Sequence, residues 1–357
     1  MRVLRYHPRA AAGDGGMSNA IRRWAMALGE LGIDSAIASD DLAPEPEGDV
    51  EWIRVTHTSL AGQRIPRDLG RALGGCDLLV LHGGWVAHNV IAARQARRAG
   101  VPYLLEPRGA YDPHILARRP WLKRAWWASL EREVARGARA VHLFFASERP
   151  HLAALDLTTP TVIAPNGVDV PTAPTWDGGS GGYVLWYGRF DLEHKGVDAL
   201  VEAVARLAPD RRPQLRLHGP DRRGDRARVV RRISDLGIDG WVSVGNPVYG
   251  REKEALLAAC SAFAYPSRWE GFGIAPAEAV ARGVPLLATP YPFARSLAER
   301  GGAIVVPAEA DALADGLERV LAPDAGAMAA AGRAAVRELY RWPDVARAWL
   351  TRAEALL

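Results

Sequence analysis

Cysteine is scarce in this chain of 357 residues: only Cys76 and Cys260 occur, both in apolar surroundings. Two isolated cysteines argue against a disulfide framework or a thiolate metal cluster, so we expect buried, reduced thiols. No apolar run approaches the length of a membrane span, and residues 1–8 lack the apolar core of a signal peptide. We therefore expect a cytoplasmic protein, with at most a peripheral contact to the inner membrane face.

Lysine is equally scarce, because Lys123, Lys195 and Lys253 are the only ones and nearly all the positive charge is arginine. The net charge of +4 and the isoelectric point near 9.2 fit phosphate-bearing ligands or an anionic membrane surface, but do not indicate nucleic acid. The length exceeds that of most single domains and favours two. No Asp-x-Asp metal motif is evident, so we expect neither a metal nor a cofactor.

Short apolar runs alternate with amphipathic stretches through both halves of the chain. Strands are expected in the first half at 3–6, 35–38, 52–55, 78–82, 103–106, 141–146 and 161–164, with helices at 18–31, 87–99 and 121–136. Strands are expected in the second half at 183–187, 214–218, 242–244, 262–265, 285–288 and 303–306, with helices at 196–207, 226–236 and 252–259. This alternation predicts parallel sheets covered on both faces, an α/β fold of two Rossmann-like, doubly wound domains.

The domain boundaries follow from composition. Residues 171–182 are rich in Pro, Gly, Ser and Thr and are predicted to be a linker. The N-terminal domain is then 1–170 and the C-terminal domain 183–335. The tail 336–357 continues a helical stretch from 327, which Pro343 breaks near its middle.

The most informative segment, 266–279, reads Pro-Ser-Arg-Trp-Glu-Gly-Phe-Gly-Ile-Ala-Pro-Ala-Glu-Ala and holds two glutamates, Glu270 and Glu278, with seven residues between them. Between them the turn Gly271-Phe272-Gly273 opens directly into a short helix, because Pro276 suits an early helical position and good helix formers follow. Backbone amides at a helix N-terminus attract oxygens and anions, and carboxylates accept hydrogen bonds from hydroxyls. Such a turn suits a sugar nucleotide.

This segment resembles the paired-glutamate signature of the family 4 retaining glycosyltransferases, which have the two-domain GT-B fold. The resemblance implies two domains that face each other across a cleft, with the C-terminal helix crossing back to the N-terminal domain. It implies that Glu270 and the amides of Gly271, Phe272 and Gly273 hold the transferred sugar, and that Glu278 holds the ribose. A capped surface helix with two solvated glutamates is the plainer alternative.

A second motif follows the first strand of the C-terminal domain, where Gly188-Arg189 and Lys195-Gly196 bracket a short loop. An arginine fork and a lysine point charge together suit a diphosphate, although a solvated charged loop is the alternative. The loop resembles the Gly-Arg…Lys-Gly motif of the family, which implies that Arg189 and Lys195 bind the diphosphate, with Gly188 beside them. Base contacts are expected from the backbone near Val244, Asn246 and Val248.

In the N-terminal domain the chemistry is less determined by the sequence. The turn Gly13–Gly16 opens the first helix, and Gly15 and Gly16 either approach the diphosphate or acceptor or are merely structural. Many family members carry a histidine where this chain has Arg108, so we expect Arg108 to stabilise the leaving phosphate in its place.

Two further pairs of polar residues follow strands of the N-terminal domain. Asp112 or His114 is expected to touch the acceptor, although a lone loop histidine is more often ordinary. His82 and Trp85 end a neighbouring strand, with a functional and a structural reading both open.

Arginines and tryptophans are interleaved in the segment Arg118–Trp127. This is the composition of an interfacial membrane helix, and tryptophans packed on the core with solvated arginines are an equal alternative.

The resemblance implies a retaining hexosyltransferase that moves a sugar from a UDP- or GDP-sugar to an acceptor hydroxyl, and we expect the cations to make a metal unnecessary. Its catalytic groups would be Glu270, Arg189, Lys195 and Arg108. The acceptor would be a glycan, a lipid-linked glycoside or a small-molecule glycoside. The alternatives are a sugar-nucleotide epimerase or hydrolase on the same scaffold, and a non-catalytic partner protein that keeps the fold.

Overall fold

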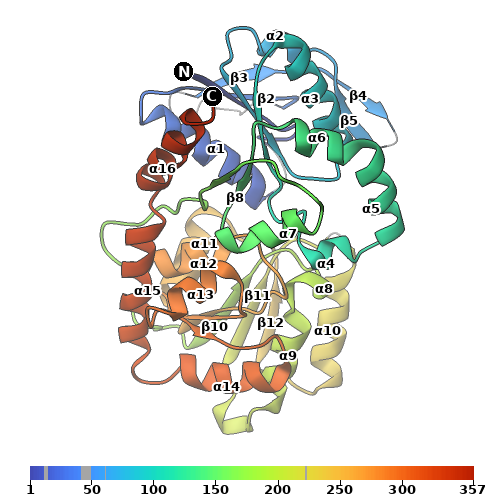
Figure 1. The fold of residues 1–357 in the computed structure, drawn as a ribbon. Helices are drawn as coiled ribbons and strands as arrows, with labels where there is room; N and C mark the ends of the chain where they lie inside the picture. Colours follow the sequence, from blue (N-terminus) through green and yellow to red (C-terminus); the bar gives the residue numbers. More distant parts are fainter. Residues whose placement is uncertain (12–14, 42–49, 61, 222) are drawn as a thin grey trace. The chain divides into compact units, whose positions relative to one another are not determined.

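The computed structural model describes residues 1–11, 15–41, 50–60, 62–221 and 223–357 (Figure 1). The chain forms two compact units: unit 1 comprises Met1–Gly167 and Trp342–Leu357, and unit 2 comprises Val168–Arg341. The segment 171–182, expected to be a linker, is hydrogen-bonded to unit 2, where Thr175 N donates to Arg282 O over 3.1 Å and Trp176 Nε1 donates to Cys260 O over 2.7 Å.

A parallel sheet of seven strands, in the order β3-β2-β1-β6-β7-β8-β9, forms the centre of unit 1. These strands are β1 (Arg2–Tyr6), β2 (Asp34–Ser39), β3 (Glu51–Arg54), β6 (Leu78–His82), β7 (Tyr103–Glu106), β8 (Ala140–Leu143) and β9 (Thr161–Ile163). The antiparallel pair β4 (His57–Leu60) and β5 (Gln63–Pro66) was not expected from the sequence. The helices are α1 (Gly16–Gly29), α2 (Leu69–Ala72), α3 (Ala87–Ala99), α4 (Pro113–Leu116), α5 (Pro120–Trp126), α6 (Arg132–Gly137), α7 (Arg149–Ala153) and α16 (Trp342–Glu354).

The two faces of this sheet bury different sets of side chains, as strand geometry requires. Leu4 and Leu79 point toward a core that includes residues of α3 and α6. Val3 and Leu78 point the other way, toward a core that includes residues of α1 and α16. The sheet is therefore covered on both faces, which confirms the predicted fold class for this unit.

The tail of the chain returns to unit 1, where α16 lies beside α1 (red and blue in Figure 1). Trp24 of α1 is 5.4 Å from the ring centroid of Trp342 and 5.8 Å from that of Trp349. The Arg5 guanidinium lies 5.1 Å from the Trp24 ring and 5.3 Å from the Trp349 ring. Aromatic burial and cation–π contacts thus fix the crossing helix on the sheet, as expected.

A single helix predicted at 121–136 is divided into α5, a π-helical turn at Trp127–Glu131, and α6. A π turn adds one residue and so changes which side chains face inward. Here it places the Glu131 carboxylate in the interior, where only 2% of the residue is exposed.

Unit 2 has a second parallel sheet, of six strands in the order β12-β11-β10-β13-β14-β15. The strands are β10 (Tyr183–Tyr187), β11 (Gln214–His218), β12 (Val242–Gly245), β13 (Ala262–Tyr265), β14 (Leu286–Ala288) and β15 (Ile304–Val305). The helices are α8 (Leu192–Lys195), α9 (Val197–Arg206), α10 (Asp225–Asp235), α11 (Gly250–Ala259), α12 (Ile274–Ala281), α13 (Pro292–Ala298), α14 (Ala310–Val320) and α15 (Ala325–Leu339). Of these, α8, α13 and α14 were not expected from the sequence. The break in the tail lies at residues 340–341, with Pro343 in the first turn of α16.

Substitution of Trp349 tests whether α16 is essential to unit 1. Trp349 is 0% exposed, so Trp349→Ala leaves a large cavity and should lower the free energy of unfolding by about 3–5 kcal/mol. Urea denaturation measures the change. Trp121→Ala is the matched control: that side chain is 72% exposed, and its loss should change stability by less than about 0.5 kcal/mol. Equal effects of the two substitutions would contradict the packing described.

Candidate functional site

Both sequence motifs of unit 2 follow adjacent strands. The loop that contains Arg189 and Lys195 leaves β10, and the loop that contains Glu270 leaves β13. Because β10 and β13 pair in parallel, both loops leave the same carboxyl edge of the sheet, where ligands of doubly wound domains bind. The structure therefore brings the two motifs together.

Lys195 and Glu270 form an ion pair at the centre of this edge. Lys195 Nζ also donates to Tyr265 OH over 2.9 Å, and Ser267 Oγ donates to Glu270 Oε1 over 2.8 Å. Burial alone raises the pKa of Glu270, but the charge of Lys195 and the hydrogen bonds that Lys195 and Ser267 donate to the carboxylate outweigh it and hold that pKa below its ordinary value. The site thus offers an ionised carboxylate that is already paired with a cation.

His194 lies beside this pair, with Nε2 3.6 Å from Glu270 Oε1 and 2.9 Å from Trp269 O. Its ring stacks on Trp269 at a centroid distance of 4.5 Å. Burial, followed by the charge of Lys195, lowers the pKa of His194 to about 4. The imidazole is therefore neutral at physiological pH and adds no charge to the site.

Glu278 lies on the second turn of α12 and is held in a similar way. Its Oε2 atom accepts hydrogen bonds from Tyr187 OH over 2.8 Å and from Lys253 Nζ over 2.9 Å. Burial and then the Glu278 charge raise the pKa of Tyr187 well above its ordinary value, so the phenol remains a neutral donor. Each glutamate of the motif is thus associated with one lysine and one tyrosine.

Two glycines make the close approach of these loops possible. Gly196 has φ +63°, and a Cβ atom there would overlap Pro266 O of the glutamate loop. Gly273 has φ +88° and caps α12 without a side-chain hydrogen bond; a Cβ there would lie 3.1 Å from Tyr291 Cε2. Only glycine fits such backbone positions at low cost. The Tyr291 hydroxyl is buried and has no hydrogen-bond partner among the described residues.

Arg189 is the more accessible cation of the edge, since 43% of its side chain is exposed and Nη2 lies 3.8 Å from Asp191 Oδ2. Gly188 N donates to His218 O over 3.0 Å and so joins the loop to β11. Of the residues expected to contact the base, Val244 lies in β12 itself, and Asn246 and Val248 lie in the loop after it, which is held from two sides. Arg226 Nη1 donates to Asn246 Oδ1 over 3.1 Å, and His218 Nδ1 lies 3.1 Å from Asn246 O.

In unit 1 the Arg108 side chain is turned inward. Arg108 and Gly109 have φ of 54° and 77°, and Ala110 N donates to Pro107 O over 3.0 Å, which are the features of a type I′ turn. Arg108 Nη2 lies 2.9 Å from Glu106 Oε1, and only 9% of the side chain is exposed. The guanidinium expected to meet a phosphate is engaged by Glu106.

Glu106 is the centre of a buried polar cluster at the carboxyl ends of four neighbouring strands. Its Oε2 atom lies 3.0 Å from His82 Nδ1, 3.5 Å from His142 Nδ1 and 3.7 Å from Arg5 Nη1. Burial lowers the pKa of His82 to about 3, whereas Arg108 and the neighbouring imidazoles overcome burial and hold the pKa of Glu106 well below its ordinary value. His82 is therefore a buried member of this cluster, which decides for the structural reading of this residue.

A second buried carboxylate, Glu131, was not found from the sequence. It accepts hydrogen bonds from Trp85 N over 3.0 Å and from Tyr111 OH over 2.9 Å. Trp126 Nε1 donates to it over 3.0 Å, and burial raises its pKa. Trp85, with φ 63°, also donates from Nε1 to Ala110 O over 2.7 Å. Glu131 thus fixes the loops after β6 and β7, and the π turn that buries it gave no sequence signal.

The remaining candidates of unit 1 lie in loops and helix starts. Asp112 caps α4 by accepting from His114 N over 2.8 Å, and His114 Nδ1 lies 2.9 Å from the same Asp112 oxygen. Gly15, with φ 60°, caps α1, and Gly16 is its first residue. Gly13 and Asp14 of the same turn lie outside the described residues.

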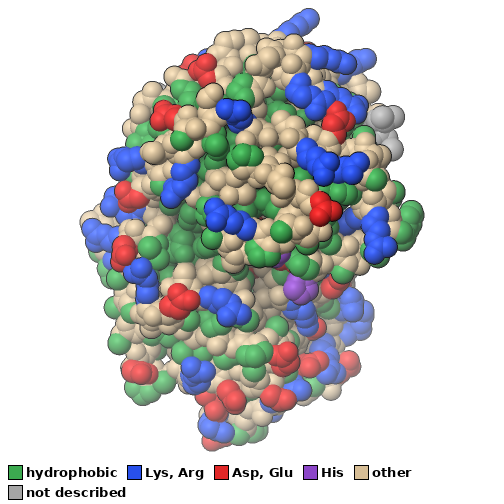
Figure 2. Space-filling view, viewed as in Figure 1, with side chains coloured by type: hydrophobic (Ala, Val, Ile, Leu, Met, Phe, Trp, Pro, Cys, Tyr) green, Lys and Arg blue, Asp and Glu red, His purple; other side chains and the backbone are tan. Residues whose placement is uncertain are grey.

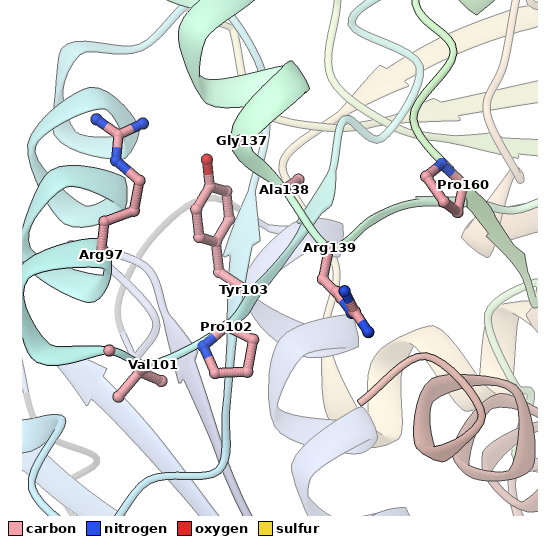
Figure 3. A pocket seen from close by; sticks show the side chains of 9 residues that line it. Arg97, Val101, Pro102, Tyr103, Gly137, Ala138, Arg139 and Pro160 are labelled. Atoms are coloured by element: carbon pink, nitrogen blue, oxygen red, sulfur yellow. The ribbon is translucent and has the colours of Figure 1, made fainter.

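A hollow in unit 1 lies at the other edge of its sheet (Figure 3). Its lining residues precede or begin β7, β8 and β9, so it lies at the amino ends of these strands, with Arg97 and Arg139 flanking Tyr103. Ligands of α/β sheets bind at the carboxyl ends, so this hollow is not part of the candidate site. Within the described ranges, no group of three or more His, Cys, Asp or Glu residues is arranged to hold a metal ion.

Comparison with known proteins covers both units. Residues 15–167 match the family described as "Glycosyl transferase 4-like domain", and residues 179–335 match "Glycosyl transferases group 1". One relative is the MMP alpha-(1->4)-mannosyltransferase of Mycolicibacterium hassiacum, 28% identical over 66% of this chain and 60% of the relative. Another is the GDP-mannose:cellobiosyl-diphosphopolyprenol alpha-mannosyltransferase of Xanthomonas campestris, 26% identical over 68% of this chain and 63% of the relative. The matched region thus spans less than two thirds of either relative.

A solved structure shares the fold over the whole chain. The sucrose-phosphate synthase of Thermosynechococcus elongatus superposes with a TM-score of 0.77 and 20% identity, covering 100% of this chain and 99% of that one. At this identity the likeness shows the fold alone, and it confirms the predicted GT-B class.

The buried Glu148 provides a pH test of unit 1. Its Oε1 atom accepts from Phe144 N over 2.8 Å and from Phe145 N over 2.9 Å, directly after β8. Burial raises its pKa from 4.5 to about 7, so folding is favoured below the unfolded pKa and loses this contribution as the pH rises through 7. Glu148→Gln should therefore stabilise the protein at pH 8 by roughly 2–3 kcal/mol relative to pH 5. Urea denaturation across this range measures it, with the exposed Glu338→Gln as control; a pH-independent difference would disprove the assignment.

Proposed function

Because the chain belongs to the group 1 glycosyltransferases, with a glycosyltransferase 4-like first half, we propose that it transfers a sugar from a nucleoside-diphosphate sugar to an acceptor hydroxyl. The observation that carries the proposal is the Lys195–Glu270 ion pair between two loops of one sheet edge. A cation for diphosphate and a carboxylate for sugar hydroxyls are there in direct contact.

The ion pair suggests how the donor enters. In the free protein Lys195 and Glu270 neutralise each other, so neither charge is left buried alone. The diphosphate of the donor competes for Lys195, with the exposed Arg189 as a second cation. Glu270, relieved of Lys195, then accepts from a hydroxyl of the sugar, and the Gly271–Gly273 turn lies against the same group.

These cations act on the charge that grows as the diphosphate leaves. Preorganised positive groups stabilise that charge without reorganisation during the reaction. We propose on this ground that the reaction needs no metal ion. The acceptor hydroxyl attacks the anomeric carbon of the sugar from the same face that the diphosphate leaves, so the anomeric configuration is retained. An oxygen of the leaving phosphate takes the proton of the acceptor hydroxyl.

The proposed acceptor is a glycan, a lipid-linked glycoside or a small-molecule glycoside. One relative acts, by its name, on a cellobiosyl-diphosphopolyprenol, which supports a lipid-linked class. Asp112 and His114 are the proposed contacts in unit 1. The ion pair of Arg108 with Glu106 favours a positioning role for Arg108, which would hold the turn at 107–110.

Arg189, Lys195 and Glu270 together form the proposed clamp on the donor, and substitution of its two cations tests the proposal. Arg189→Ala or Lys195→Ala should cost on the order of 2–4 kcal/mol of transition-state stabilisation, two to three decades in kcat/KM. Acceptor-dependent release of nucleotide from GDP-mannose and UDP-glucose measures it, with Arg300→Ala, which removes a surface ion pair with Glu338, as control. Release without acceptor would indicate a hydrolase, inversion within the donor an epimerase, and absence of turnover a non-catalytic partner. Unchanged turnover in Arg189→Ala would exclude that residue from the clamp.

A membrane contact through α5 is proposed as a second property. Trp126 and Trp127 pack against the core of unit 1, whereas Trp121 is 72% and Leu122 is 42% exposed. At the right edge of Figure 2, over α5, hydrophobic side chains lie next to Lys and Arg side chains. This combination favours an anionic bilayer surface. In the part of the chain that the structure describes, no helix has the length and apolarity to cross a bilayer.

Sedimentation with phosphatidylglycerol vesicles tests the membrane contact. The double substitution Trp121→Ser and Leu122→Ser removes the exposed apolar side chains and should weaken vesicle binding about tenfold or more, because burial of such side chains contributes roughly 1.5–3 kcal/mol each. Val230→Ser, at an exposed apolar residue of α10, should leave binding unchanged. Absence of sedimentation of the unaltered protein would end the membrane proposal.

A further inference from the structure

The ion pair between Lys253 and Glu278 is not used by the clamp described above. Lys253 lies on α11 and Glu278 on α12, and their charged atoms are 2.9 Å apart. We infer that Lys253 is a positioning residue for ribose recognition: together with Tyr187 it fixes one oxygen of Glu278 so that the other oxygen is presented to the ribose hydroxyls. This inference rests on the proposed function, because it takes Glu278 as the ribose ligand.

The geometry at the carboxylate is the first argument. Tyr187 OH and Lys253 Nζ both donate to Oε2, over 2.8 and 2.9 Å. Two donors on one oxygen fix the rotation of the carboxylate plane, which leaves Oε1 as the oxygen for a ligand. The Glu278 side chain is 24% exposed, so a ligand can reach it.

The chemistry of the partners is the second argument. Tyr187 is a buried phenol that stays protonated and always donates. Lys253 supplies a charge, and its side chain is only 20% exposed. Charge-assisted hydrogen bonds in partly buried positions are about twice as strong as neutral ones, so this pair holds the carboxylate more firmly than solvent would.

A merely structural role for Lys253 must be separated from this one. A second ion pair joins the same two helices: Arg282 Nη2 donates to Glu254 Oε1 over 2.8 Å, and Arg282 Nη1 donates to the backbone oxygen of Glu278 over 2.9 Å. Glu254→Gln weakens this link between the helices without touching the Glu278 carboxylate. It is therefore the matched control for Lys253→Met.

The test is calorimetric binding of GDP and UDP and of their 2′,3′-dideoxy forms. Lys253→Met should weaken binding of the ribonucleotide about tenfold, the loss expected for one hydrogen bond to a charged group. It should change binding of the dideoxynucleotide by less than about twofold, because no ribose diol is left to recognise. Lys253→Arg should restore most of the ribonucleotide affinity. Lys195→Met, which acts on the diphosphate, should weaken both nucleotides equally.

Each of the other possible outcomes contradicts the inference and shows what Lys253 does instead. Equal weakening of ribo- and dideoxynucleotide by Lys253→Met would show that Lys253 acts on the phosphate or the base. The same loss in Glu254→Gln would reduce Lys253 to a link between helices, and unchanged ribonucleotide binding would remove it from recognition. If the unaltered protein bound neither GDP nor UDP, the proposed function itself would fail, and this inference with it.

Discussion

The candidate site depends on one constraint: a largely buried carboxylate at the carboxyl edge of the sheet needs a cation beside it. Desolvation of an unpaired carboxylate is costly, and Glu270 and Glu278 of unit 2 offset this cost by pairing with Lys195 and Lys253. In a chain with three lysines, two lie in these pairs. The site is therefore internally neutralised, and on the proposed function a ligand would enter by exchanging its own charges and hydroxyls for these existing contacts.

Much of this arrangement was predictable from the sequence. The alternation of strands and helices placed both motif loops after parallel strands, and spacing placed Glu270 before and Glu278 within α12. The partner of Glu278 was not predictable, because Lys253 is 25 residues away on another helix and no periodic pattern links the two. The tyrosines Tyr187 and Tyr265 were missed for the same reason, since each ends a strand whose other residues are apolar and reads as core.

In unit 1 the sequence did not predict the direction in which the Arg108 side chain points. Arg108 follows a strand at the edge where ligands bind, so an outward guanidinium was the natural expectation. The structure turns it toward Glu106, the last residue of the buried strand β7. A glutamate at the end of the run Tyr-Leu-Leu-Glu was the available signal, since an acid in a strand buried on both faces needs a cationic partner nearby. Had this requirement been applied, the sequence would have predicted that Arg108 pairs with Glu106.

The geometry of the clamp is set by backbone rather than by side chains. Gly196 and Pro266 approach so closely that no side chain fits between the two loops, and Arg268 N donates to His194 O over 2.8 Å across the same gap. Lys195 and Glu270 therefore start from fixed backbone positions within unit 2. On the proposed function, a diphosphate that binds Lys195 would require only these two side chains to move. A cation held in this way requires little reorganisation as charge develops on the leaving group, which is the condition for electrostatic stabilisation of a transition state.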